Sequence, residues 1–489
     1  MASIFAGLES ARQALSVSQE ALEVTSQNIA NSSTTGYSRQ RLVTNAIAPD
    51  TGDSKFVSNQ AAVGGGVTAS SVEQIRNDFL DTRYRSENST KSYYDGLSDT
   101  LSQLEDVFNE LDSSSSSTDT ATGLSGDVSS LVSSLTKLQA SPDDTSLASS
   151  VRSAMDTICQ TVRSDVNQLD ELSTQVAGDL SDTIGGAQSG GVDAMLQSVG
   201  SLNMQIANYE TGGQTANDLR DQRNNLLDQI SADFDINVTQ ESNGMVTVAL
   251  KNDSTHMLID ENNNVEGLET SSDGKTLTWQ DGSAANVTGG SVGADIELLN
   301  GDGTGTGTYG NLGIPAMNAK LNAFAAGLTT AINSVVTTND ASGQALLQCD
   351  GGEAKNLSLT DAWTTDAALL TENYKSSDTG NYIGQFISAF SGTSAITFQG
   401  ATYSGTIQDF TDSISMDVAN RLSYIKQMAS SSDSIVKNIT SQRSSVSGVS
   451  IDEEGINIIK YQQSYNAAAR VVTAINDMLD TLINSMGVR

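Results

Sequence analysis

The sequence predicts a mainly α-helical protein, an elongated rod of long helices with a central β-rich outer domain and paired N- and C-terminal coiled-coil helices. Three patterns support this fold class. Apolar residues return every seven positions at both ends of the chain, and steps of three and four residues run through most of the remainder. Residues 234–310 instead alternate apolar and polar side chains between Gly- and Asn-rich turns, which is typical of β-hairpins.

Each end of the chain carries an apolar seam. A helix with such a stripe needs a partner helix, because an isolated helix would leave the stripe in water. The predicted assembly seam consists of Ile4, Leu8, Leu15, Leu22, Ile29, Ile458, Tyr461, Tyr465, Val472, Ile475, Leu479, Leu482 and Met486. The last helix opens with a predicted capping box of Ser450 and Glu453. Both ends therefore indicate a protein that assembles rather than one that catalyses.

The order of the elements predicts three domains. Residues 1–70 and 447–489 form a terminal helical domain, residues 71–233 and 311–446 form a helical rod domain with some mixed β segments, and residues 234–310 form the β-rich outer domain. Because this order is symmetric about its centre, the chain is expected to run out along a rod and to return. The first and last helices would then lie side by side.

The composition disfavours several classes of function. The 489 residues include 59 acidic and 25 basic side chains, which gives a formal net charge of −34. Nucleic acids and anionic membranes bind Lys- and Arg-rich surfaces, and the sequence has no such run. It also has no apolar stretch of about 18 residues and no signal-peptide pattern at the N-terminus, features that alone predict a cytoplasmic protein. Cys159 and Cys349 exclude a multi-disulfide scaffold but leave one bridge open.

No catalytic, cofactor-binding or metal-ligating constellation is predicted. The single histidine, His256, lies among polar residues and is expected at the surface. Asp260–Asn264 begins like a calcium loop, but Val265 stands where the sharp turn requires glycine, so a polar hairpin turn is the better interpretation. Gly289–Gly293 fits the pattern of a nucleophile elbow but lies in a polar, Gly-rich stretch and is interpreted as a loop. The sequence therefore predicts neither an enzyme nor a cofactor.

Three segments resemble a known family. Asn28–Gln40 is similar to the N-terminal motif of flagellar rod, hook and hook-associated proteins, and Ser445–Glu454 with the following Tyr461–Tyr465 is similar to their C-terminal motif. Asp218–Arg223 also resembles a segment of this family. The residues that carry the terminal motifs are Asn28, Asn31, Gly36, Tyr37, Arg39, Gln40, Gly448, Asp452, Glu453 and Glu454.

The resemblance implies a structural subunit of the bacterial flagellum, exported through the flagellar type III apparatus without a cleaved signal peptide and located outside the cell at the hook–filament junction. The terminal helices would form an inner tube and the β-rich domain the outer surface. The implied partners are further copies in a homo-oligomeric ring, the hook protein, the second junction protein (hook-associated protein 3) and an export chaperone that binds the C-terminal helix. No nucleic acid and no membrane insertion are implied.

Other interpretations stay open. The chain is also compatible with another axial protein, either the hook protein or the second junction protein, and with an extracellular hydrolase or glycan-binding module housed in the β-rich domain. The seams are further compatible with a coiled coil inside one monomer. If the seams are instead shared between subunits, the terminal helices are expected to be frayed in the free subunit and to fold on assembly.

Overall fold

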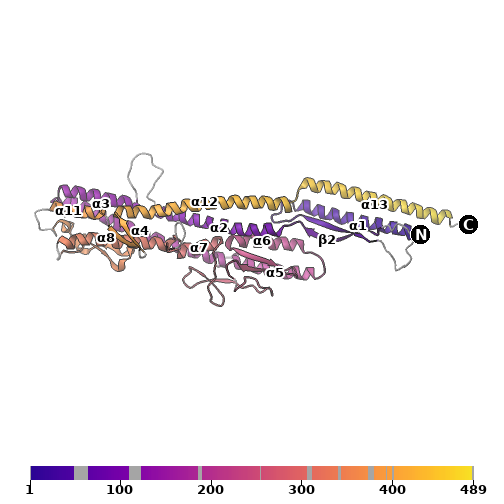
Figure 1. The fold of residues 1–489 in the computed structure, drawn as a ribbon, viewed down its shortest axis with the longest axis horizontal. Coiled ribbons are helices and arrows are strands. Elements are labelled where there is room, and N and C mark those ends of the chain that lie inside the picture. The colour runs from indigo at the N-terminus through magenta and orange to yellow at the C-terminus, as the bar shows by residue number, and fades with distance from the viewer. Residues whose placement is uncertain are drawn as a thin grey trace. The chain divides into compact units, whose positions relative to one another are not determined.

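The computed structural model describes residues 2–48, 64–108, 123–185, 190–253, 255–304, 311–339, 343–372, 379–392, 394–398 and 401–486. This part of the chain is mainly α-helical, which confirms the predicted fold class, and it includes helices of 40 and 41 residues (Figure 1). The chain divides into two compact units. Unit 1 comprises Met1–Asn88, Val192–Gly267 and Asp433–Arg489, and unit 2 comprises Ser89–Gly191 and Leu268–Ser432.

Unit 1 contains the two terminal helices and the elements that support them. Its elements are α1 (Ala2–Ala30), β1 (Gln40–Ile47), β2 (Gly66–Gln74), the start of α2 (Asp78–Val107), α5 (Val192–Glu210), α6 (Asn217–Asp233), β3 (Ile236–Gln240), β4 (Val246–Leu250), the end of α12 (Ile407–Ser447) and α13 (Ile451–Met486). The antiparallel pair β1–β2 packs on α1, and α5 packs on α6. Strands β3 and β4 form a second antiparallel hairpin.

Unit 2 is built around the long helix α4. The elements of this unit are the end of α2, α3 (Gly123–Ala140), α4 (Thr145–Ile184), β5 (Leu268–Thr270), β6 (Leu277–Trp279), α7 (Gly290–Asn300), α8 (Ile314–Asn339), β7 (Leu347–Cys349), β8 (Leu357–Leu359), α9 (Asp361–Thr365), α10 (Leu369–Glu372), α11 (Thr379–Ser391), β9 (Ser394–Phe398), β10 (Ala401–Gly405) and the start of α12; two 3₁₀ turns, η1 (Asp350–Gly352) and η2 (Ala354–Asn356), join β7 to β8.

The core of unit 2 follows from the apolar spacing of α4. Its side chains at steps of three and four residues, from Val151 to Leu180, are buried against α3, α7 and α8. Asp144 caps the helix, because its carboxylate accepts hydrogen bonds from the backbone N–H groups of Ser146 (2.8 Å) and Leu147 (3.4 Å). Helices α3, α4 and α5 thus lie in the part of the chain where steps of three and four residues between apolar side chains predicted helices.

The segment predicted to be β-rich also contains a helix. Strands β3 to β6 lie where the alternation predicted strands, but Gly290–Asn300 forms α7, so the loop interpretation of Gly289–Gly293 is wrong. Its buried residues Val292, Leu298 and Leu299 follow a helical spacing. The Gly-rich composition of the segment had favoured a loop instead. The three-domain division itself stays a prediction.

Met317 in α8 and Met416 in α12 give a matched test of packing in unit 2, because the first side chain is fully buried and the second is 60% exposed. Met317→Ala is expected to lower the free energy of unfolding by about 2–5 kcal/mol, since it leaves a cavity. Met416→Ala should change it by less than about 0.5 kcal/mol. The two tryptophans, Trp279 and Trp363, are both buried in unit 2, so urea titration followed by their fluorescence reports on this unit. Equal destabilisation by both substitutions would contradict the packing described.

Candidate functional site: the terminal helix pair

The structure brings the two predicted seams together. Helix α1 packs along α13, and the two lie side by side in Figure 1. Ile475 is 7% exposed and lies against Gly7, where a Cβ would be 3.5 Å from its Cδ1 atom. The other seam residues whose side chains are described are only half-buried: Leu8, Leu15, Leu22, Ile29, Ile458, Tyr461, Tyr465, Val472 and Leu479. The side chains of Ile4, Leu482 and Met486 lie outside the described part. One partner helix therefore covers the seam incompletely.

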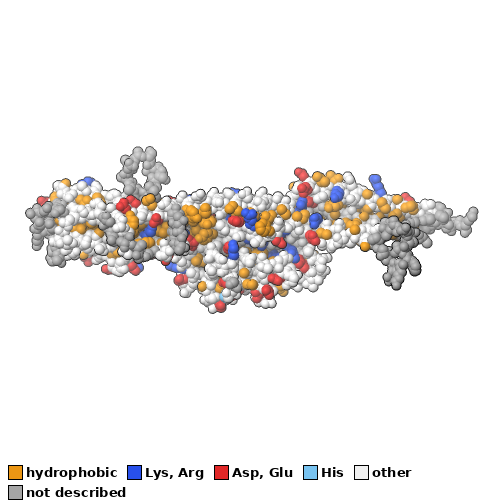
Figure 2. Space-filling model, in the orientation of Figure 1, with side chains coloured by type: hydrophobic (Ala, Val, Ile, Leu, Met, Phe, Trp, Pro, Cys, Tyr) orange, Lys and Arg blue, Asp and Glu red, His pale blue; other side chains and the backbone are white. Residues whose placement is uncertain are grey.

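Helix α13 also carries a second apolar stripe that the seven-residue spacing did not predict. Ile456, Ile459, Val471 and Met478 are 67%, 57%, 48% and 51% exposed. At 3.6 residues per turn these four positions fall within about 120° of the helix surface, away from the seam. Figure 2 shows hydrophobic side chains on the surface of the α1–α13 region. We call these four residues the outer stripe. A helix with two apolar faces can contact more than one partner.

The N-terminal motif forms a hydrogen-bonded clamp after α1. Asn28, which is 1% exposed, donates to the carbonyl of Gln40 (2.9 Å) and accepts from the N–H of Gln40 (2.9 Å) and the hydroxyl of Tyr37 (2.9 Å). Burial raises the pKa of Tyr37, and the nearby carboxylates of Asp218, Asp221 and Glu454 raise it further, so the phenol keeps its proton and donates.

Two smaller interactions shape the loop inside this clamp. Gly36 has a φ of +82°, which favours glycine, and a Cβ there would lie 3.3 Å from Asn225. Asn31 donates to the carbonyl of Gln27 at 3.1 Å. Together with the clamp, these contacts fix the path of the chain from α1 to β1.

The C-terminal motif lies at the junction of α12 and α13. Gly448 is required there, because a Cβ would be 2.3 Å from the carbonyl oxygen of Ser444. The predicted capping box is half confirmed: Ser450 accepts from the N–H of Glu453 at 3.4 Å, but the Glu453 carboxylate binds Arg39 at 2.7 Å. The N–H of Arg39 also donates to the carbonyl of Ser447 (2.8 Å). The two terminal motifs therefore contact each other, with Glu454 buried and Asp452 exposed.

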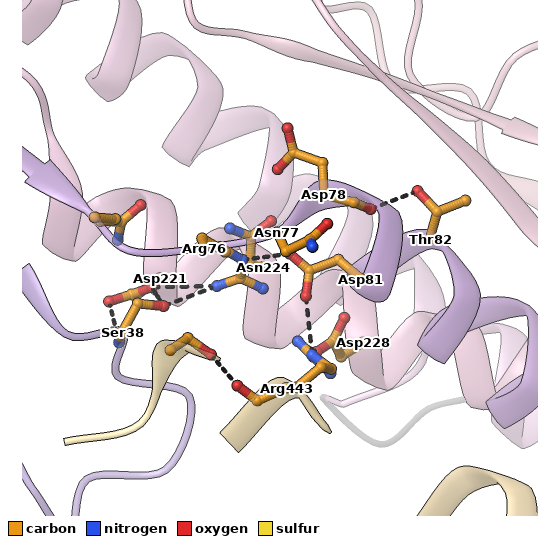
Figure 3. Close-up of polar contacts among 12 residues, drawn as sticks. Ser38, Arg76, Asn77, Asp78, Asp81, Thr82, Asp221, Asn224, Asp228 and Arg443 are labelled. Carbon is orange, nitrogen blue, oxygen red and sulfur yellow. Dashed lines mark hydrogen bonds and ion pairs between the residues drawn. The ribbon is translucent and has the colours of Figure 1, made fainter. Parts of the chain in front are cut away.

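A chain of alternating charges connects these motifs to the helices of unit 1 (Figure 3). The order is Asp221, Arg76, Asp81, Arg443, Asp228 and Arg85, with successive N–O distances of 3.3, 2.5, 2.9, 2.8 and 2.8 Å. We call these six residues the ion-pair chain. Its first member accepts from the N–H (2.9 Å) and hydroxyl (2.8 Å) of Ser38. The six side chains come from α2, α6, α12 and the segment after β2, so they hold these elements together.

Charge balance determines the electrostatics of this chain. Burial raises the pKa of Asp221, and the hydrogen bonds from Ser38 and the charge of Arg76 offset part of this effect. Burial alone lowers the pKa of Arg443, but the carboxylates of Asp228 and Asp81 outweigh it and raise the value. The Arg443 guanidinium also stacks on Tyr84, with 4.3 Å between its Cζ atom and the ring centroid.

Four residues of the segment Asp218–Arg223 in α6 make side-chain contacts. Asp218 accepts from Gln40 (2.9 Å) and Arg220 binds Glu210 through two bonds of 2.7 Å. Asp221 holds Ser38, and Arg223 donates to Asn203 (3.0 Å) and to the carbonyl of Gly244 (2.8 Å). The family resemblance had identified this segment from the sequence. No sequence pattern predicted a role for Arg76, Asp81 or Arg443.

The remaining chemical features are few. Within the described ranges, no three His, Cys, Asp or Glu side chains are grouped so that they could hold a metal ion. None of the helices described is both long enough and apolar enough to cross a membrane. Cys159 and Cys349 are free thiols, and burial raises the pKa of Cys159 to about 12.

Three family profiles match the chain. Residues 101–346 match "Flagellar hook-associated protein FlgK helical domain". Residues 8–37 match "Flagella basal body rod protein", and residues 440–486 match "Flagellar basal body rod FlgEFG protein C-terminal". The last two contain most of α1 and α13.

Similar proteins cover the whole chain. Flagellar hook-associated protein 1 of Bacillus subtilis (strain 168) is 30% identical over 530 residues, which span 100% of this chain and 99% of the relative. The protein of the same name from Escherichia coli (strain K12) is 23% identical over 98% of this chain and 99% of its own length. The solved flagellar hook junction protein FlgK from Burkholderia pseudomallei is 17% identical, with a TM-score of 0.44 over 55% of this chain and 46% of its own.

Arg443→Gln tests the ion-pair chain. It leaves Asp81 and Asp228 without one of their cations in a mostly buried setting, so we expect a loss of about 3 kcal/mol in the stability of unit 1. Native-state hydrogen exchange of the α6 amides measures this loss. The control is Arg12→Gln, whose exposed pair with Glu9 should contribute nothing measurable. Unchanged exchange in the Arg443 variant would show that the ion-pair chain does not hold α6.

Proposed function

This chain belongs to the family of flagellar hook-associated protein 1, and from that premise we propose how it assembles. Its function is structural, as a junction protein between the flagellar hook and filament. Copies of the chain form a ring through their terminal helices. The observation that carries this proposal is the apolar surface that α1 and α13 leave uncovered, namely the half-buried seam and the outer stripe.

The energetics favour several neighbours for each α13. Burying one large apolar side chain contributes about 1.5–3 kcal/mol, whereas ordering one residue costs about 1–2 kcal/mol. The contact with α1 alone covers the seam only in part, so further helices are needed before burial outweighs ordering along the whole of α13. The α1 and α13 helices of neighbouring copies, each with its own seam, provide apolar surfaces of the same kind.

The family suggests how the rest of the chain is placed. Residues 1–70 and 447–489 form the inner tube, residues 71–233 and 311–446 form the helical shell around it, and residues 234–310 form the outer surface. The ring has the hook protein on one side and the second junction protein, hook-associated protein 3, on the other. Before export, a chaperone binds α13. Export uses the flagellar type III apparatus without a cleaved signal, and the exported protein has no enzymatic role.

Substitutions in the outer stripe test assembly directly. The double variant Ile456→Asp and Val471→Asp places two carboxylates in a proposed helix–helix contact, so we expect normal secretion but loss of filaments from the hooks, seen by electron microscopy of cells. The control is Gln462→Glu, which adds a carboxylate at an exposed polar position of the same helix, outside both the outer stripe and the seam. Filaments of normal number on cells carrying the double variant would contradict the proposed role of the stripe.

The free subunit provides a second test. If the seam needs neighbours, amides of α1 and α13 should exchange faster in the purified monomer than those of α4 or α6, because fewer apolar contacts protect them. Hydrogen exchange followed by mass spectrometry measures this difference. Strong protection of both terminal helices at a monomeric concentration would instead favour a coiled coil completed within one subunit.

A further inference from the structure

Unit 1 contains a cavity of about 440 Å³ beside α2, α6 and the β3–β4 hairpin. It is far larger than the volume of about 30 Å³ that one water occupies in the liquid. The arginines among its lining residues are Arg76, Arg85, Arg220 and Arg223. Four of only 25 basic side chains in an acidic protein thus surround one cavity.

Three of these arginines are neutralised by carboxylates. Arg76 pairs with Asp81 and Asp221, and Arg85 pairs with Asp228. Arg220 holds both oxygens of Glu210 through its Nε and Nη2 atoms. The fourth arginine is different.

Arg223 is 2% exposed and forms no ion pair with any carboxylate in the described part of the chain. Both of its hydrogen bonds use Nη1, with the uncharged oxygens of Asn203 and Gly244 as acceptors. Its buried Nε–H finds no acceptor among the residues described, and its Nη2 has none there either. Burial, with a smaller contribution from the positive charge of Arg220, lowers the pKa of Arg223 to about 10, while Glu210 opposes the shift.

The Nε atom of Arg223 is too deeply buried for a ligand to reach. Its Nη2 atom, which forms no hydrogen bond with the described residues, is the donor that can face the cavity. A guanidinium N–H donates strongly to carboxylate, sulfate and phosphate oxygens. A buried charge without a counter-charge is costly, and an anion at this nitrogen would reduce the imbalance. We propose that the cavity is a binding site for a small oxyanion, which accepts a hydrogen bond from Nη2 of Arg223.

The acidic lining residues limit what can bind. Asp81 is already paired with Arg76 and Arg443. Glu73 and Asp78 are exposed, so water screens their charges, but they still disfavour a large polyanion. A compact ion such as inorganic phosphate fits both the volume and the charge.

Isothermal titration of the full-length protein with inorganic phosphate tests the site. We expect saturable binding of one phosphate per chain at constant ionic strength, with chloride as the balancing anion. Sulfate and acetate form separate arms that distinguish an inorganic oxyanion from a carboxylate. Absence of saturable binding for all three oxyanions would overturn the proposal and leave the cavity to water.

Variants locate the bound ion. Arg223→Gln should weaken phosphate binding at least about tenfold, and Arg12→Gln, which does not line the cavity, should leave it unchanged. If circular dichroism shows that Arg223→Gln does not fold, two substitutions of the exposed lining residue Gln240 test the site instead. Gln240→Lys should strengthen and Gln240→Glu should weaken binding by about twofold each, because the added charges act on the anion in opposite directions. Equal affinity in a folded Arg223→Gln variant, or in both Gln240 variants, would place the anion elsewhere and refute the assignment.

Discussion

The six alternating charges of the ion-pair chain are the constraint on which unit 1 depends. Each inner member of this chain touches two charges of opposite sign, so none of its six ions is left without a partner. Such a chain specifies geometry more than it adds stability, because desolvation offsets much of the Coulombic attraction. Moving any one of these helices would separate at least one ion pair. The remaining charge would then lie unpaired in the protein interior, which solvates it poorly. Ser38, the clamp of Asn28 and the start of α13 therefore have fixed positions from which the terminal helices extend.

The terminal helices combine this polar anchor with unfinished apolar surfaces. At the anchor, hydrogen bonds and ion pairs have defined partners and directions. Along α1 and α13, apolar contact is non-directional and grows with the area removed from water. The anchor thus supplies orientation, and the seam with its outer stripe supplies surface for association. The polar anchor therefore serves the folding of one chain, and the apolar surfaces serve the association of several chains.

The sequence predicted the elements with regular periodicity and missed those that depend on distant partners. The seven-residue spacing of Leu8, Leu15 and Leu22 identifies α1 without any tertiary information. By contrast, Arg76 and Asp221 are 145 residues apart, and Arg443 and Asp228 are 215 residues apart, so no local pattern joins them. The seven-residue spacing did not predict the outer stripe, because Ile456 and Ile459 lie outside the heptad positions of the seam. Helix α7 was missed because its glycines resemble a turn in composition.

The same limit applies to Arg223. Its sequence neighbours gave a family resemblance for the whole segment, and nothing in them distinguishes this arginine from Arg220. The distinction arises because α5 and the β3–β4 turn offer Arg223 an amide and a carbonyl, whereas α5 offers Arg220 a carboxylate. Such a difference depends on which side chains surround each guanidinium in the folded chain.

The pair formed by Arg39 and Glu453 has a consequence for the sequence of folding events. It joins residues 414 positions apart, and Glu453 is largely solvated. Closing a flexible loop of that length costs about 5 kcal/mol in chain entropy, whereas an exposed ion pair returns at most about 1 kcal/mol. The pair can form only once the intervening chain is already compact. The direction in which α13 leaves α12 is consequently among the last features of the monomer to become fixed.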